Sequence, residues 1–74
     1  MSADAIRGRV RNRIRELRLA AGLSQQELAE RVGATRQTIN AIEQEKYSPS
    51  LELAFRIART FEAGFEEVFQ FGAR

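Results

Sequence analysis

The 74-residue sequence predicts one all-α domain, and its length suits a single domain. Two observations predict this class, and a third limits what can stabilise it. Apolar residues recur three or four positions apart through most of the chain, as on the buried face of a helix. Ser or Thr precedes several of these segments, where helix-capping residues are favoured. The chain has no Cys and no His, which excludes disulfides and argues against a zinc site, so helix packing, a second copy of the chain, or both must stabilise it.

Composition narrows the class of protein. With 43% hydrophobic and 30% charged residues, the chain is expected to fold rather than remain disordered. No apolar run approaches the roughly 20 residues that span a bilayer, and the first ten residues lack the apolar stretch of a secretory signal, so a cytoplasmic location is expected. An enzyme is not expected, because there is no Cys or His, no phosphate-binding glycine loop and no carboxylate pair with a cleft to hold it. No metal and no cofactor is indicated.

The first half of the chain predicts an arm and two helices. Residues 1–9 show weak periodicity and are predicted to form a flexible basic arm. A first helix is predicted to end at Gly22, and its apolar positions are Val10, Ile14, Leu17 and Ala21. The segment 24–27, Ser-Gln-Gln-Glu, matches the capping box, in which the Ser hydroxyl and the Glu carboxylate each accept a hydrogen bond from a free backbone N–H. The helix that follows is expected to bury Leu28, Ala29 and Val32.

The second half predicts two further helices and a short final turn. Thr35 is placed to cap a third helix, and Ser50 is placed to cap a fourth after the polar loop 43–48 and Pro49. The inner face of the fourth helix is predicted to consist of Leu53, Ala54, Ile57, Ala58 and Phe61. Beyond Gly64, a final turn contains Phe65, Val68 and Phe69, with a short strand as one interpretation of 68–71. The predicted domain is 10–71, and 72–74 form a tail.

The segment 24–44 carries the most specific pattern in the chain. Two helices joined by a three-residue turn need a small residue where they cross, and Ala29 supplies it. The turn requires a positive φ, which Gly33 adopts without steric cost. The second helix must return branched apolar residues to the first, and Ile39 and Ile42 have the spacing to do so. Together these features predict a helix-turn-helix unit.

The stretch 14–69 resembles the Xre/Cro family of phage-repressor-like regulators, and in particular its short, stand-alone members. The segments that carry the resemblance are Ile-Arg-Glu-Leu-Arg (14–18), Gly-Leu-Ser-Gln-Gln-Glu-Leu-Ala (22–29), Arg-Gln-Thr-Ile-Asn-Ala-Ile-Glu (36–43) and Pro-Ser-Leu-Glu-Leu-Ala (49–54). The resemblance implies a five-helix, lambda-repressor-like fold, with double-stranded DNA as the ligand.

The resemblance also implies that 35–44 is a recognition helix, which enters the major groove and reads bases with its first residues. Arg36, Gln37 and Asn40 are expected to point outward, because Ile39 and Ile42 point inward. Arg can bridge the O6 and N7 atoms of guanine, and Gln or Asn can bridge the N6 and N7 atoms of adenine. A contact with a thymine methyl group is expected of Ala41. The alternative is that these residues are ordinary solvated surface.

Several residues are candidates for contacts with phosphate. Residues 1–22 hold six arginines and two acidic residues, a net charge of +4, while the whole chain carries +2. The resemblance implies a phosphate contact by Gln25, at a helix N-terminus that favours anions. The other candidates are Thr35, Thr38, Lys46, Tyr47, Arg11 and Arg13. Thr35 has capping alone as its alternative, Tyr47 has packing on its own loop, and the arm is a weaker candidate for a minor groove.

Two departures from the family pattern accompany one structural match. The resemblance implies that Arg18 and Glu43 form a partly buried ion pair between the first and third helices. The family commonly has Asn-Gly-Lys after the recognition helix, where this chain has Gln44-Glu45-Lys46. A non-Gly residue there costs about 1 kcal/mol if left-handed, and its carboxylate would repel phosphate. The glycine that usually ends the next helix is shifted to Gly64, which puts that boundary in doubt.

The Phe-rich C-terminal end suggests a second subunit. Phe65 and Val68 are expected to close the core of one chain. Phe69 and Phe71 are better explained by a homodimer interface that also involves Val68, through antiparallel pairing of two 68–71 strands. Two-fold symmetry would place the two recognition helices about 34 Å apart, one turn of DNA.

The function predicted from these patterns is a sequence-specific transcriptional regulator, a repressor that binds an inverted-repeat operator as a homodimer. One alternative is an antitoxin, which would bind a toxin partner through the arm or the Phe-rich end. Another is a protein-interaction domain that has lost DNA binding, against which the polar residues of 36–40 argue. No membrane partner is expected.

Overall fold

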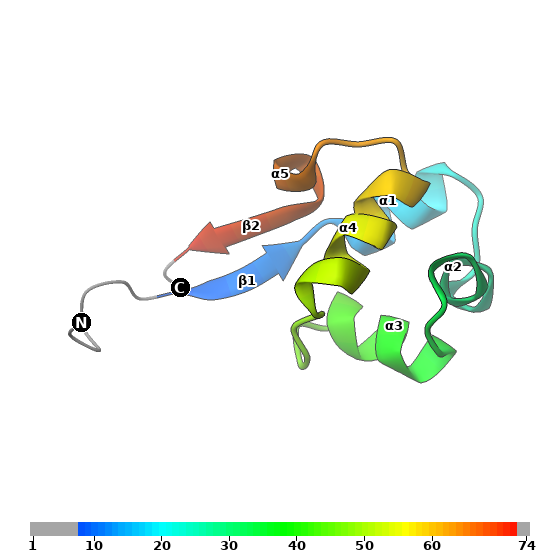
Figure 1. Ribbon diagram of the computed structural model, residues 1–74, viewed down its shortest axis with the longest axis horizontal. Coiled ribbons are helices and arrows are strands. Elements are labelled where there is room, and N and C mark those ends of the chain that lie inside the picture. The colour runs from blue at the N-terminus through cyan, green and yellow to red at the C-terminus, as the bar shows by residue number, and fades with distance from the viewer. Residues whose placement is uncertain (1–7, 73–74) are drawn as a thin grey trace.

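The computed structural model describes residues 8–72, which form five helices and two short strands. In chain order these are β1 (Arg9–Asn12), α1 (Ile14–Ala20), α2 (Gln25–Val32), α3 (Arg36–Glu43), α4 (Leu51–Thr60), α5 (Phe65–Val68) and β2 (Phe69–Gly72). Helices α1 to α4 gather into one body, and the two strands form a ribbon that extends from it (Figure 1). The five predicted helices are therefore present, together with a small sheet that joins the two ends of the domain. No helix in the part of the chain described has the length and apolar character that crossing a membrane requires.

The ribbon corrects the predicted start of the first helix. Residue Val10 was expected in a helix, but it lies in β1, which pairs antiparallel with β2 and places Val10 opposite Phe71. The three- and four-residue spacing fits a helix, but strand pairing with the distant C-terminal segment decides the local structure. Helix α1 begins only at Ile14, whose N–H donates to the side chain of Asn12. The neighbouring N–H of Arg13 donates to the carbonyl of Val68, which fixes the end of β1 beside α5.

The predicted boundaries of the arm and the tail shift accordingly. Arg9 was placed in the arm but lies in β1, and Gly72 was placed in the tail but lies in β2. Residues 1–7 of the predicted arm and residues 73–74 of the tail lie outside the described residues. The C-terminal strand predicted at 68–71 is present at 69–72, but it pairs with β1 of the same chain and not, as predicted, with the same strand of a second copy.

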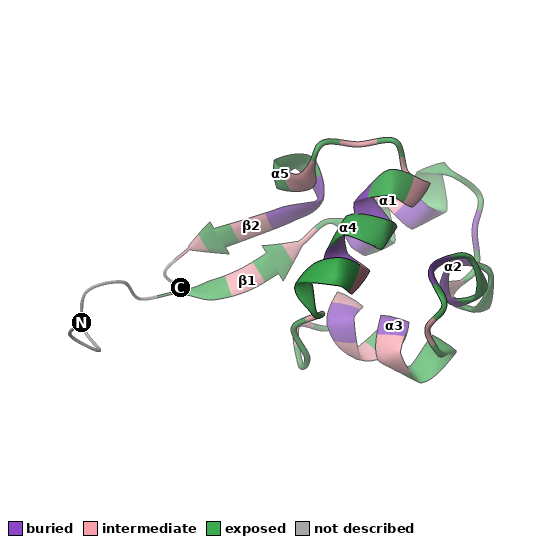
Figure 2. Ribbon diagram, in the orientation of Figure 1, coloured by how far each residue is buried: buried purple, intermediate pink, exposed green. Residues whose placement is uncertain are grey.

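One hydrophobic core joins the helices to the base of the ribbon, and the buried residues line the inward faces in Figure 2. Its fully buried large side chains are Ile14, Leu28, Ile39, Ile42, Ile57 and Val68. Phe69 is only 5% exposed, and its ring centroid lies 5.1 Å from that of Phe65. Val68 and Phe69, which were predicted at a dimer interface, are thus buried within one chain because α5 and β2 fold back onto α4. Phe71 remains 57% exposed.

The predicted capping residues begin three of the helices. Ser24 and Glu27 form the complete capping box, with the Ser hydroxyl accepting from the Glu27 N–H and the Glu carboxylate accepting from the Ser24 N–H. The hydrogen bond from the Ser24 backbone, with that from its hydroxyl, holds the pKa of Glu27 below its ordinary value. Thr35 and Ser50 cap α3 and α4 in the same way. These local hydrogen bonds set the first residue of each helix.

Four helices are followed by a residue in the left-handed region, and for α3 this residue is Glu45, with φ of 61°. Gly22 and Gly33 have φ of 73° and 77° after α1 and α2, as the predicted turns require. After α4 the same conformation falls on Glu62, with φ of 53°, and not on Gly64, which instead precedes α5 as its N-cap. The α4 boundary therefore lies where the family pattern has glycine, although this chain has a glutamate there.

Candidate nucleic-acid interface

Helices α2 and α3 form the predicted helix-turn-helix. Gly33 turns the chain between them, and the Ala34 N–H donates to the carbonyl of Ala29 at 2.9 Å. Ala29 is fully buried, as is Ile39, and Ile42 is 1% exposed, so the inner faces of both helices are in the core. Burying these positions fixes the rotation of α3 about its axis.

The opposite side of α3 is a polar stripe. Arg36, Gln37 and Asn40 are exposed, and Ala41 is partly buried beside them. Positions one, two, five and six of an α-helix lie on neighbouring parts of its surface. The structure therefore brings all four residues predicted to contact bases onto one outward surface, defined here as the recognition surface.

A buried ion pair holds α3 against α1. The Arg18 Nε lies 2.7 Å from Oε2 of Glu43 and its Nη2 lies 3.2 Å from Oε1, with side-chain exposures of 10% and 5%. The Arg18 Nη1 donates to the carbonyl of Leu23 at 3.0 Å, which fixes the guanidinium in the loop before α2. This two-point geometry fits the planar donors of Arg to a carboxylate. The pair implied by the resemblance is present, and it connects α1 to the end of α3.

The amide of Gln25 connects this ion pair to the recognition surface. Its Nε2 donates to Oε1 of Glu43 at 3.2 Å and to Oδ1 of Asn40 at 3.1 Å. Both amide hydrogens are thus used inside the protein, so a phosphate contact by this nitrogen requires breaking one of these bonds. Sequence patterns predicted roles for Gln25 and Asn40 separately and missed the bond between them. Gln44, which had no predicted role in recognition, also donates to Oδ1 of Asn40, at 3.3 Å.

The other side chains predicted to contact phosphate differ in whether they already bond to other residues of the protein. Thr35 uses its hydroxyl to cap α3 and lies 3.0 Å from the hydroxyl of Thr38. Lys46 and Tyr47 are exposed in the loop after α3, where the side chain of Tyr47 is 53% exposed.

Of the two arginines predicted to reach phosphate, Arg11 is exposed on β1, and the Nε of Arg13 lies 2.6 Å from Oε1 of Glu16. The first arginine is therefore free of ion pairs among the residues described, and the second is held in an exposed pair.

The loop after α3 contains Glu45, whose negative charge is paired with an arginine. Glu45 has φ of 61° in the position where the family has glycine, as anticipated. Its Oε1 lies 3.3 Å from Nη2 of Arg9, so β1 supplies a positive charge beside the carboxylate that was expected to repel phosphate. This pair was not predicted, because Arg9 was expected in the flexible arm and lies in β1 instead.

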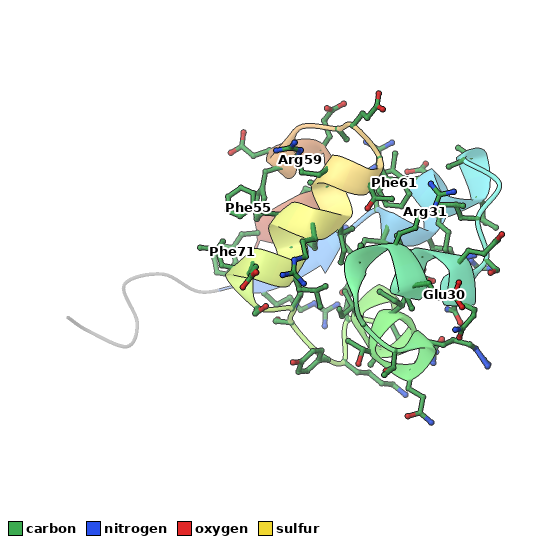
Figure 3. All side chains as sticks on the ribbon, turned by 45° about the vertical axis from the view of Figure 1, so that its right-hand side comes forward. Glu30, Arg31, Phe55, Arg59, Phe61 and Phe71 are labelled. Atoms are coloured by element: carbon green, nitrogen blue, oxygen red, sulfur yellow. The ribbon has the colours of Figure 1, made fainter. Side chains whose placement is uncertain are left out.

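An exposed apolar surface lies on α4 and the ribbon. Leu51, Phe55 and Phe71 are 68%, 51% and 57% exposed. Phe55 and Phe71 project from the same flank of the molecule (Figure 3). The Phe55 ring packs against that of Phe65, with centroids 5.0 Å apart, next to a groove of about 390 Å³. Leu51 and Phe55 were not predicted as interface residues. Both are large apolar residues outside the predicted inner face of the fourth helix, and this pattern could have indicated an exposed apolar surface.

The described residues contain no cluster of three or more acidic, Cys or His side chains that could bind a metal ion. The surface around α3 offers hydrogen-bond donors and acceptors from Arg36, Gln37 and Asn40.

Comparison with known proteins gives the same fold and places it in a family. Residues 14–68 match the family model described as helix-turn-helix. The chain is 52% identical over 62 residues to an uncharacterized HTH-type transcriptional regulator of Archaeoglobus fulgidus, covering 84% of this chain and 89% of the relative. It is 48% identical over 60 residues to YgzD of Bacillus subtilis, a relative with the same description, covering 81% and 91%.

A solved structure agrees with this. The restriction-modification controller protein C.AhdI from Aeromonas hydrophila is 33% identical and superposes with a TM-score of 0.69, covering 73% of this chain and 82% of that one. The family is one of regulators rather than enzymes. From the match over most of the domain and the identities to these relatives, the chain belongs to the Xre/Cro-type helix-turn-helix family of DNA-binding transcriptional regulators.

Proposed function

We propose that this regulator is a repressor that binds an inverted-repeat operator as a homodimer, with α3 of each copy in a major groove. The observation that carries the proposal is the recognition surface, on which Arg36, Gln37 and Asn40 are exposed while Ile39 and Ile42 anchor the helix. In helix-turn-helix proteins the second helix reads base edges with its N-terminal residues. Arg36 and Gln37 occupy the first turn of α3 and therefore have the first access to bases.

Phosphate contacts are assigned to groups that flank this surface. Lys46 and Tyr47 follow α3 in an exposed loop, and the hydroxyl of Thr38 lies in its first turn. Arg11 and Arg13 add positive charge from β1 and the start of α1. Such contacts fix orientation without reading sequence, and they make binding weaken as salt rises.

The exposed apolar surface supports the dimer. Leu51, Phe55 and Phe71 expose large side chains on a small domain, which is typical of an interface with another protein. The occupant proposed is a second copy, which would bury this surface about a two-fold axis and leave both α3 helices free. Of the residues first predicted at the interface, Phe71 remains in it, while Val68 and Phe69 contribute by shaping the base of the ribbon.

Selection of bound sites from random DNA duplexes at stated salt tests the proposal. We expect an inverted repeat with half-site centres about one turn apart, roughly 34 Å. Arg36→Ala or Gln37→Ala should lose about 1–3 kcal/mol at one position in each half-site. Lys46→Ala is the control, because loss of a phosphate contact should weaken all sequences about equally. A preferred site unchanged by both α3 variants would contradict the proposal.

A further inference from the structure

The side chain of Glu43 determines which atoms donate and which accept in the hydrogen bonds that connect it, through Gln25, to Asn40. A carboxylate only accepts hydrogen bonds, and both oxygens of Glu43 accept from the guanidinium of Arg18. Because the pair is almost fully buried, this arrangement does not reorient with solvent. The atom of Gln25 that lies 3.2 Å from Oε1 of Glu43 must therefore be a donor, which is Nε2.

The orientation of the Gln25 amide in turn fixes the orientation of the Asn40 amide. The Nε2 of Gln25 has a second hydrogen, and its partner 3.1 Å away must be an acceptor, which is Oδ1 of Asn40. Gln44 donates to that oxygen as well, at 3.3 Å. Both lone pairs of Oδ1 are thus engaged. The other end of the amide, Nδ2, makes no hydrogen bond within the described residues, and Asn40 is exposed on the recognition surface.

We propose that Asn40 reads DNA only as a hydrogen-bond donor and so favours guanine, with Gln25 as the positioning residue that enforces this. Bridging adenine requires an amide to donate to N7 and to accept from N6 through the same oxygen that Gln25 and Gln44 occupy here. Guanine instead presents two acceptors, N7 and O6, and no donor on this edge, so a side chain that can only donate suits it. The buried ion pair thereby selects which base an exposed side chain recognises. This inference rests on the proposed function.

Site selection with variants at positions 25, 26 and 40 tests it. Asn40→Ala first identifies the operator position that Asn40 reads, as the one whose preference it relaxes. We expect the wild-type protein to prefer guanine over adenine there by about tenfold, the scale of one specific base contact. Asn40→Asp, which can only accept, should move the preference to the amino-bearing bases, cytosine or adenine.

Gln25→Met separates positioning from direct contact. Methionine keeps the length of the side chain but cannot donate, so within the described residues Oδ1 of Asn40 keeps only its bond from Gln44, an exposed side chain whose own amide can turn with it. The guanine-to-adenine ratio should therefore fall toward one at that position alone. Gln26→Met is the matched control, because Gln26 is exposed on the same helix and, within residues 8–72, its side chain bonds only to Glu30. It should leave the ratio at the wild-type value. Thermal unfolding of both variants checks that the helices remain intact.

The outcomes separate this inference from the proposed function. An adenine preference in the wild-type protein, no position relaxed by Asn40→Ala, or an unchanged ratio in Gln25→Met would overturn the inference. If Arg36→Ala and Gln37→Ala still change the site in those cases, the proposed function stands without it. If neither of these α3 variants changes the preferred site, the proposed function itself has failed.

Discussion

The helix-turn-helix and the terminal ribbon are organised by contacts of different range. In the segment 24–44, Ser24 bonds to Glu27 and Thr35 bonds to Thr38, each pair only three residues apart. In the ribbon, Arg9 lies opposite Gly72, so the partners come from the two ends of the domain. Local capping patterns can be predicted from the sequence, whereas the pairing of distant strands is set by tertiary structure. The periodicity at Val10 is therefore misleading, while the capping signals are reliable.

The helix-turn-helix also depends on one distant contact, because Arg18 of α1 pairs with Glu43 at the end of α3. Arg18→Ala leaves the carboxylate of Glu43 buried without its partner and should lower the free energy of unfolding by about 3–5 kcal/mol. Chemical denaturation at neutral pH measures this loss.

Arg13→Ala is the control for Arg18→Ala. Its ion pair with Glu16 has side-chain exposures of 51% and 65%, so it should cost less than about 1 kcal/mol. Equal losses in the two variants would show that burial of the pair with Glu43 is not what makes it important.

Phe69 and Phe71 of β2 differ in whether their rings belong to the core of one chain. Phe69→Ala removes a ring that is 5% exposed and should cost about 3 kcal/mol, at any protein concentration. Phe71→Ala, two residues along the same strand, removes a ring that is 57% exposed. It should change the stability of the monomer little but weaken self-association in sedimentation experiments. A large loss of monomer stability in Phe71→Ala, or a small one in Phe69→Ala, would reverse the roles assigned to the two rings.

The site shows the same division between what sequence predicts and what it does not. Burial of Ile39 and Ile42 follows from their spacing, and it determines which α3 residues face outward. The contact between Gln25 and Asn40 depends on how closely α2 and α3 cross, and no periodicity encodes that distance. The Arg9–Glu45 pair is likewise unreadable, since it requires β1 to be placed beside the loop after α3. The ion pair of Arg18 and Glu43 was predicted only through the resemblance to a family.

The smallest expected effect concerns how much β1 stabilises the loop after α3, through the ion pair of Arg9 and Glu45. Glu45 and Glu62 both have left-handed φ, 61° and 53°, after a helix, and replacing either by Gly should relieve about 1 kcal/mol of strain. Glu45→Gly also removes the ion pair with Arg9, whose side chain is 60% exposed, at a cost between about 0 and 1 kcal/mol. Glu62 has no ion pair among the residues described, so Glu62→Gly should stabilise more than Glu45→Gly in thermal unfolding. The difference between the two gains then measures the Arg9–Glu45 pair, and it should shrink at high salt because the pair is exposed. Equal gains at low salt would mean that β1 lends the loop after α3 no measurable stability.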